Sequence, residues 1–122
     1  MLAAGVDLVA VKRIEENVSR YGARFLSRVF TEGELAYCRG RTQELAARFA
    51  AKEAVSKTLG VGIHHRDGVQ WHEIEVVSDA NGKPSVRLVG SAAQRAGELG
   101  FGTFALSLSH TREYAIAMVV AE

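Results

Sequence analysis

The sequence predicts an α+β fold in which a mainly antiparallel sheet packs against a long central helix. Three observations support this prediction. A strand-like stretch opens the chain, the longest stretch with a helical period follows at 43–59, and the second half holds alternating segments joined by short turns. The chain has 122 residues, enough for one compact domain and too few for two, so we expect a single domain over 1–122.

The first thirty residues predict a strand and two short helices. Residues 2–9 form a short apolar run that is typical of a buried strand. From Val11 onward the apolar residues recur at helical spacing until Gly22, which ends that segment. A second short helix is expected at 23–30.

The next segment carries recognisable helix boundaries. The stretch "TEGE" at 31–34 is a capping box, and it predicts a helix that stops near Gly40. Thr42 is expected to cap the longest helix, at 43–59, and Gly60 is expected to terminate it.

The second half is predicted to be rich in strands. Residues 60–68 have no period and are expected to form a loop. The stretch "WHEIEVVS" at 71–78 alternates, and "DANGKP" at 79–84 supplies an Asn-Gly turn before a return strand at 85–89. The remaining expected elements are a short helix capped by Ser91, a strand at 103–109, a connection at 110–113 and a strand at 114–121.

The overall composition is that of a soluble globular protein. Hydrophobic residues make up 48% and charged residues 24%, and the net charge of +1 leaves any electrostatic signal to the distribution of charges. Cys38 is the only cysteine, which fits a reducing compartment. The apolar start is too short for a membrane span and lacks the basic leader of a signal peptide, so a cytoplasmic protein without membrane segments is expected.

Asp7 is unusual because it lies inside an apolar strand. Burying an unpaired carboxylate costs several kcal/mol, so a compensating group is expected. A metal ion, a basic side chain or a water-filled cleft at the end of the strand would each serve. The alternative is a carboxylate that caps the following helix or faces solvent.

The helix at 43–59 presents one polar face among small apolar residues. Glu53 lies there beside Phe49, together with Ser56 and Lys57. Because Glu53 and Lys57 are four residues apart, an ordinary helical ion pair worth a few tenths of a kcal/mol is one interpretation, and a ligand role for Glu53 is the other. A different face carries only small residues, which would let another element pack closely: Ala47, Ala51, Ala54 and Thr58.

Two further stretches carry charge. The connection at 110–113 contains His110, Thr111 and Arg112, which fit either an anion site or an ordinary polar turn. Between 12 and 28 the cations outnumber the acids, which would attract an acidic partner, although a solvated helix face explains the pattern equally well. These cations are Lys12, Arg13, Arg20, Arg24 and Arg28.

Other candidate residues have simpler interpretations. His64 and His65 are adjacent, but no second cluster at metal-ligand spacing accompanies them, so surface residues are expected. Cys38 is expected to be a buried thiol. Trp71 and Phe104 are isolated aromatics, which counts against an RNA-binding module, because such modules stack bases on paired aromatic side chains.

Four motifs taken together resemble one family. The stretches "GVDLVAVKRI" at 5–14, "RFAAKEAVSK" at 48–57, "NGKP" at 81–84 and "SLSHTREYA" at 107–115 are similar, in order and spacing, to those of holo-[acyl-carrier-protein] synthases. These are the short bacterial 4′-phosphopantetheinyl transferases. The resemblance covers nearly the whole chain. It implies the 4′-phosphopantetheinyl transferase fold and transfer of 4′-phosphopantetheine from coenzyme A to a serine of apo acyl carrier protein, releasing adenosine 3′,5′-bisphosphate, in fatty acid biosynthesis.

The resemblance also implies roles for individual residues. In the family, Mg²⁺ is held by the carboxylates that match Asp7 and Glu53, and Lys57 matches the ammonium beside the pyrophosphate. These three are therefore the expected catalytic residues, and the general base is left open. The expected coenzyme A contacts are Arg48, Ser56, Lys57, Asn81, Gly82, Lys83, Pro84, His110 and Thr111.

The resemblance further implies an assembly and a partner. Family members are homotrimers with active sites between subunits, so the turn at 81–84 would serve the neighbouring subunit. The acidic carrier protein would dock on the basic residues Arg13, Arg20, Arg24 and Arg28, with Arg13 in the leading position. A carrier from a polyketide or peptide synthetase is the alternative to the fatty-acid carrier. No nucleic acid or membrane partner is expected, and residues 63–68 receive no role.

Overall fold

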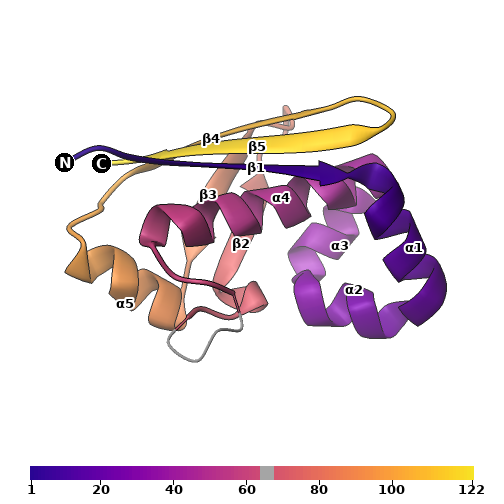
Figure 1. Ribbon diagram of the computed structural model, residues 1–122, viewed down its shortest axis with the longest axis horizontal. Coiled ribbons are helices and arrows are strands. Elements are labelled where there is room, and N and C mark those ends of the chain that lie inside the picture. The colour runs from indigo at the N-terminus through magenta and orange to yellow at the C-terminus, as the bar shows by residue number, and fades with distance from the viewer. Residues whose placement is uncertain (64–67) are drawn as a thin grey trace.

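The computed structural model describes residues 1–63 and 68–122, and it shows a three-stranded antiparallel sheet lying along one long helix, α4 (Figure 1). This arrangement confirms the predicted α+β class and the central helix. In chain order the elements are β1 (Ala3–Ala10), α1 (Val11–Tyr21), α2 (Ala23–Val29), α3 (Glu32–Cys38), α4 (Thr42–Leu59), the 3₁₀ turn η1 (Trp71–Glu73), β2 (Ile74–Ser78), β3 (Pro84–Leu88), α5 (Gly90–Glu98), β4 (Phe104–His110) and β5 (Tyr114–Ala121).

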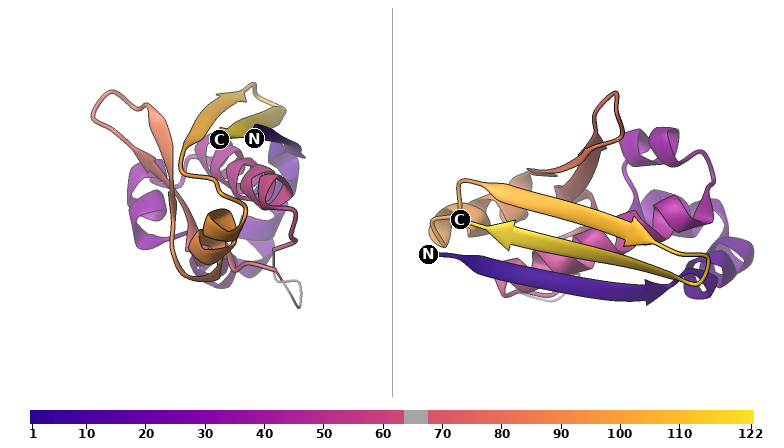
Figure 2. Two further views of the ribbon diagram at one scale, coloured as in Figure 1. Left: turned by 90° about the vertical axis from the view of Figure 1, so that its left-hand side faces the viewer. Right: turned by 90° about the horizontal axis from the view of Figure 1, so that it is seen from above.

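The strands form two separate sheets. The larger sheet has the order β1-β5-β4, and the hairpin β2–β3 forms a two-stranded sheet of its own. Figure 2 shows the three long strands side by side above α4, while the tip of the β2–β3 hairpin projects away from the body. The first and last residues lie near each other at one end of the larger sheet. Within the described part of the chain, no helix is long and apolar enough to cross a membrane.

Among the described residues, one face of the larger sheet is covered and the other is exposed. The covered face packs small and branched side chains onto α4, and these are Val9, Ala115, Ala117 and Val119. On the opposite face Val6 and Leu8 are 52% and 61% exposed, and Ile116 and Met118 of the paired strand are exposed beside them. The strand predicted at 2–9 is present, but the prediction that it is buried holds for one side only, because an antiparallel sheet packed on one side alternates between core and surface.

Strand β1 approaches α4 unusually closely at Gly5. A Cβ added at Gly5 would lie well inside 3.0 Å of both the Ala54 carbonyl oxygen and the Thr58 hydroxyl. The Thr58 hydroxyl is satisfied by donating to the Ala54 carbonyl at 2.9 Å. The prediction that the small face of α4 lets another element pack closely is thus confirmed, and that element is β1.

One predicted helix cap is confirmed and another is wrong. The Thr31 hydroxyl accepts from the Glu34 N–H at 3.2 Å, and the Glu34 carboxylate accepts from the Thr31 N–H at 2.9 Å, which completes the capping box. Thr42, by contrast, lies inside α4, whose N-cap is Arg41. The guanidinium of Arg41 donates back to the carbonyls of Tyr37 and of Cys38 in α3, which holds the short link between α3 and α4.

The first turn of α5 is capped from outside the helix. Ser91 lies inside α5, so the prediction that it is the N-cap is wrong. The carboxylate of Glu73 accepts from the Ser91 backbone N–H and from its hydroxyl. Glu73 also accepts from the Gln70 N–H at 2.6 Å, which forms the 3₁₀ turn η1 where a strand was predicted from Trp71. Strand β2 consequently begins only at Ile74.

The turn of the β2–β3 hairpin is held by Asp79. Its carboxylate accepts from the backbone N–H groups of Asn81 at 2.8 Å and of Lys83 at 2.9 Å. Gly82 has φ of 82°, a left-handed conformation that glycine adopts without strain. The predicted turn is confirmed, although Pro84 already belongs to β3, where it pairs with Ser78.

A buried ion pair joins α3, α4 and β2. The ammonium of Lys52 lies 2.8 Å from the Glu34 carboxylate, and both side chains are fully buried. Lys52 also donates to the carbonyls of Trp71 at 3.1 Å and Ile74 at 2.5 Å, while Glu34 accepts from the Val76 N–H at 2.8 Å. Burial lowers the pKa of Lys52, and the adjacent Glu34 carboxylate opposes that shift.

Gly5→Ala should lower the free energy of unfolding by about 1–3 kcal/mol, because the added methyl group would force β1 away from α4. Urea unfolding followed by circular dichroism at fixed protein concentration measures the change. Gly97→Ala is the matched control, since nothing lies within 4 Å of the added Cβ in α5, and it should raise stability by about 1 kcal/mol. A Gly5→Ala protein as stable as the parent would contradict the close approach.

Lys52→Met should lower the free energy of unfolding by about 3–5 kcal/mol, because it leaves the Glu34 carboxylate buried without a cation. The same urea experiment measures the loss. Adding Glu34→Gln removes that isolated charge, so the double variant should be more stable than Lys52→Met alone. If the second substitution brings no recovery, the ion pair is not the source of the loss.

Candidate active site

The close approach of β1 to α4 places Asp7 beside Lys57. The Lys57 ammonium donates to the Asp7 carboxylate and to the Val6 carbonyl, in both cases at 3.0 Å. Asp7 is 18% exposed and Lys57 is 55% exposed, so the pair is open to solvent on the lysine side. Of the groups expected to compensate Asp7, a basic side chain is therefore present. The ordinary ion pair within the helix is not formed, because Lys57 turns to β1 instead of to Glu53.

Glu53 is the second carboxylate of this cluster. Burial and the nearby Asp7 carboxylate raise its pKa above the usual value, while the charges of Lys57 and Arg13 act in the opposite direction. Within the described part of the chain, the Glu53 carboxylate has no hydrogen bond or ion pair of its own. Asp7, Glu53 and Lys57 together carry a net negative charge, which favours a bound cation.

The chemistry of these donors fits Mg²⁺. Mg²⁺ prefers oxygen ligands, and proteins commonly hold it with one or two carboxylates while water and phosphate oxygens complete the shell. Across residues 1–63 and 68–122 there is no group of three or more His, Cys, Asp or Glu side chains that would form a complete metal cage. The chain thus offers two carboxylates, Asp7 and Glu53, and leaves the other positions to water or to a ligand.

Ser56 and Arg48 lie on the same helix but face inward. The Ser56 hydroxyl is buried and donates to the Glu53 carbonyl at 2.7 Å. Arg48 is only 3% exposed, with one terminal nitrogen 2.6 Å from the Glu44 carboxylate and the other 2.9 Å from the Ser78 hydroxyl. Its guanidinium lies 4.5 Å above the ring of Tyr37. The expected phosphate contact of Arg48 stays a prediction, and the structure holds this side chain among protein partners.

His110 and Thr111 end β4 and begin the connection to β5. The His110 ring nitrogen Nε2 lies 3.2 Å from the Glu44 carboxylate. The Thr111 hydroxyl accepts from the N–H groups of Glu113 and Tyr114, which shapes the turn. His110 and Arg48 are therefore brought to one carboxylate, Glu44. Glu44 was not among the residues predicted from the sequence, although its place one helical turn before Arg48 indicates a salt bridge.

The turn at 81–84 belongs to the β2–β3 hairpin, which is a separate sheet from the one that carries Asp7. It forms the projecting tip of the β2–β3 hairpin (Figure 2), where Gly82 faces the hydroxyl of Tyr37 in α3. His64 and His65 lie outside the described residues. Cys38 is fully buried, and burial raises the pKa of its thiol to about 11, so the expected buried thiol is present and is not a nucleophile.

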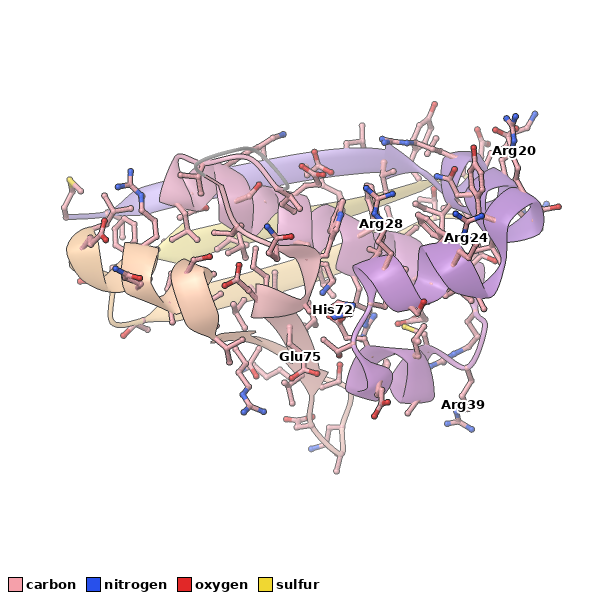
Figure 3. The ribbon with its side chains drawn as sticks, turned by 90° about the horizontal axis from the view of Figure 1, so that it is seen from below. Arg20, Arg24, Arg28, Arg39, His72 and Glu75 are labelled. Carbon is pink, nitrogen blue, oxygen red and sulfur yellow. The ribbon has the colours of Figure 1, made fainter. Side chains whose placement is uncertain are left out.

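A pocket of about 520 Å³ opens between α1, α2 and α4. Arg13 lies 5.2 Å above the ring of Phe49 at its edge, and Phe49 packs against Trp71 with the ring centres 5.0 Å apart. Arg24 and Arg28 line the same pocket, together with aromatic residues of α1 and α2, which are Tyr21 and Phe25. Figure 3 shows Arg20, Arg24 and Arg28 at this end of the molecule, whereas Arg39 lies apart at the end of α3. The aromatic residues Tyr21 and Phe25 are spaced among these arginines in the sequence, and this pattern indicates a surface that is both basic and aromatic.

Comparisons with known proteins agree on one family. The model of the 4′-phosphopantetheinyl transferase superfamily matches residues 3–119. The chain is 53% identical over 124 residues to a holo-[acyl-carrier-protein] synthase of Herpetosiphon aurantiacus, covering 98% of each chain. Its structure is similar to that of the Helicobacter pylori holo-[acyl-carrier-protein] synthase in complex with coenzyme A, with a TM-score of 0.87 and 30% identity over 98% of this chain and 99% of that one. The Chronobacterium ammoniagenes ACPS–CoA complex gives a TM-score of 0.86 at 34% identity, covering 100% of this chain and 97% of that one.

Proposed function

Since this chain belongs to the 4′-phosphopantetheinyl transferase superfamily and, within it, to the holo-[acyl-carrier-protein] synthases, we propose that it transfers the 4′-phosphopantetheine group of coenzyme A to a serine of an apo acyl carrier protein, with Mg²⁺ as cofactor. The observation that carries the proposal is the cluster of Asp7, Glu53 and Lys57. The domain would span 1–122, and the product that leaves is adenosine 3′,5′-bisphosphate.

The chemistry of the transfer needs the charges that this cluster provides. The serine oxygen bonds to the phosphorus that carries the pantetheine arm, and the bond from that phosphorus to the bridging oxygen of the pyrophosphate breaks. Negative charge grows on the departing bisphosphate, and the exposed ammonium of Lys57 is available to stabilise it. Asp7 and Glu53 would hold Mg²⁺, which neutralises charge on the phosphate oxygens.

The coenzyme A contacts are proposed around the Asp7–Glu53 cluster and around Glu44, the carboxylate that pairs with Arg48 and His110. Ser56 and Arg48 flank Glu53 along α4, and His110 and Thr111 lie at the end of β4. Asn81, Gly82, Lys83 and Pro84 are proposed to act on the neighbouring subunit, in agreement with a hairpin tip that projects from its own chain (Figure 2).

The basic end of the molecule is proposed to dock the carrier protein. Arg13, Arg20, Arg24 and Arg28 supply positive charge there, and the pocket beside them supplies aromatic surface. Arg13 links this surface to the cluster of carboxylates, because it stacks on Phe49 and its charge acts on Glu53. A carrier held at these arginines would therefore present its serine near Glu53. An acidic carrier of fatty acid biosynthesis in the cytoplasm fits this surface.

The decisive experiment is mass spectrometry of apo acyl carrier protein after incubation with this protein, coenzyme A and Mg²⁺. The expected result is the mass of one added phosphopantetheine arm, together with free adenosine 3′,5′-bisphosphate. No added mass on any of the fatty-acid, polyketide and peptide-synthetase carriers would overturn the proposal, and a reaction with only one of them would identify the carrier.

Asp7→Asn and Glu53→Gln should each reduce the transfer rate by about 100-fold or more, because each removes one carboxylate from the cation site. Mn²⁺ can replace Mg²⁺ in a binding assay followed by electron paramagnetic resonance. Its binding should weaken in both variants, while the midpoint of urea unfolding should change no more than it does for a substitution on the surface. Glu98→Gln, on α5 away from the cluster, is the control and should behave like the parent. Unchanged Mn²⁺ binding in both site variants would remove these carboxylates from the metal site.

Arg13→Glu should raise the KM for the carrier protein by about 100-fold and change the KM for coenzyme A far less, because it reverses a charge at the docking surface. Steady-state kinetics with each substrate varied in turn measure the two values. Arg39→Glu makes the same charge reversal away from this surface (Figure 3), so it should leave both KM values near those of the parent. An equal rise in both KM values for Arg13→Glu would argue against docking there.

A homotrimer is proposed on the exposed face of the larger sheet. Val6, Leu8, Ile116 and Met118 are neighbours across the β1–β5 pair, so their side chains form a continuous apolar surface. Light scattering coupled to size-exclusion chromatography should give three times the mass of one chain. Met118→Glu buries a charge in that interface and should produce monomers, and a monomeric parent protein would contradict the assembly.

A further inference from the structure

Glu44 connects the two side chains that are proposed to lie near the phosphates of coenzyme A. One oxygen of its carboxylate is 2.6 Å from the Arg48 guanidinium, and the other is 3.2 Å from the His110 ring. Arg48 belongs to α4 and His110 to the end of β4, so Glu44 bridges the helix and the sheet. Its side chain is 22% exposed, whereas that of His110 is 37% exposed.

The contact determines which nitrogen of His110 carries a proton. An ionised carboxylate only accepts hydrogen bonds, so the nitrogen that faces Glu44, Nε2, must be the donor. The other nitrogen, Nδ1, then remains for a ligand, either as an acceptor or, in the protonated ring, as a donor to an anion. Glu44 therefore sets both the tautomer and the orientation of His110.

Glu44 is itself held in place by a rigid support. Arg48 is 3% exposed, donates to the Ser78 hydroxyl at 2.9 Å and lies over the Tyr37 ring at 4.5 Å. The positive charge of Arg48 cancels the negative charge of Glu44, so Glu44 can orient His110 without presenting a net negative charge to a phosphate. The three side chains form a series in which Arg48 fixes Glu44 and Glu44 fixes His110.

We propose that Glu44 is a positioning residue of the coenzyme A site, which aligns His110 for the anionic nucleotide of the donor. This inference rests on the proposed function, since it needs His110 to meet a phosphate of coenzyme A. It also gives Arg48 a further role: from its buried position Arg48 supports Glu44, which in turn orients His110. The alternative is that Glu44 competes with the phosphate for His110 and Arg48. In that case, removing Glu44 would strengthen the binding of the nucleotide.

The test measures the Kd of adenosine 3′,5′-bisphosphate by isothermal titration calorimetry, and the KM for coenzyme A and kcat by transfer assay. Glu44→Ala should raise both the Kd and the KM about fivefold, the usual loss for one aligned hydrogen bond, and change kcat less than twofold. In a His110→Ala background the same substitution should have no further effect. Glu44→Asp retains a carboxylate and should recover part of the loss. Glu98→Ala removes a glutamate that pairs with Arg95 in α5, far from the site, and should match the parent.

Nitrogen-detected NMR of the histidine rings gives an independent readout. The parent protein should show His110 with the proton on Nε2, and Glu44→Ala should lose that preference. Tighter binding by Glu44→Ala would overturn the proposal in favour of competition. If Glu44→Ala weakens bisphosphate binding equally in the parent and in the His110→Ala variant, Glu44 has only a structural role. The same conclusion follows if Glu44→Ala leaves the His110 tautomer unchanged. The proposed function is tested separately by the parent protein: if it transfers phosphopantetheine while Glu44→Ala binds the bisphosphate normally, only the role of Glu44 fails.

Discussion

The contact between the backbone of β1 and the small face of α4 is the constraint on which the rest of the site depends. Because Gly5 has no side chain, the strand lies directly against the Ala54 carbonyl and the Thr58 hydroxyl. Asp7 follows two residues later, on the same side of the strand. Its carboxylate accepts a hydrogen bond from Lys57, which is exposed on α4. The position of the proposed cation-binding cluster is thus a consequence of backbone packing. A bulkier residue at position 5 would move the strand and separate the charges without touching any of them.

Two lysines on α4 differ sharply in burial, and only the exposed one, Lys57, has a proposed role in the reaction. Lys52 is fully buried, pairs with Glu34 and donates to two carbonyls, so all three of its protons are used inside the protein. Lys57, little more than one turn further on, is 55% exposed and, among the described residues, bonds to one carboxylate and one carbonyl. An exposed pair of this kind adds little to stability. Its value lies in an ammonium that remains free to approach a ligand while Asp7 stays next to Glu53.

Two charged side chains outside that cluster, Arg13 and Glu44, are each held in position by a neighbouring side chain. Arg13 stacks on Phe49, which in turn packs on Trp71, so a cation on the surface is fixed by an aromatic pair. Glu44 is fixed by Arg48, which Ser78 and Tyr37 hold in place. In both cases a partly exposed charge is oriented by a group behind it. Such preorganisation reduces the loss of side-chain freedom when a charged partner or nucleotide binds.

The sequence by itself determined the features that depend on neighbouring residues. Helical and alternating periods, the Thr31–Glu34 capping box and the turn at 79–84 all follow from side chains within a few positions of one another. The face of α4 that carries only small residues was also predicted from the sequence, because helix geometry determines which residues lie on the same face. The resemblance of the motifs added Asp7 and Glu53 as expected partners, and their joint role in binding a metal ion stays a prediction.

Only the tertiary structure decided the partners that lie far apart in the chain. Lys57 bonds to a residue 50 positions away, Lys52 to carbonyls about 20 positions on, and Glu44 to a histidine 66 positions away. It also decided that one face of the sheet stays uncovered and that Glu73 caps α5 in place of Ser91. Periodicity shows which side of an element is apolar, but it carries no information about which other element packs there, and that packing sets both burial and the distance between charges.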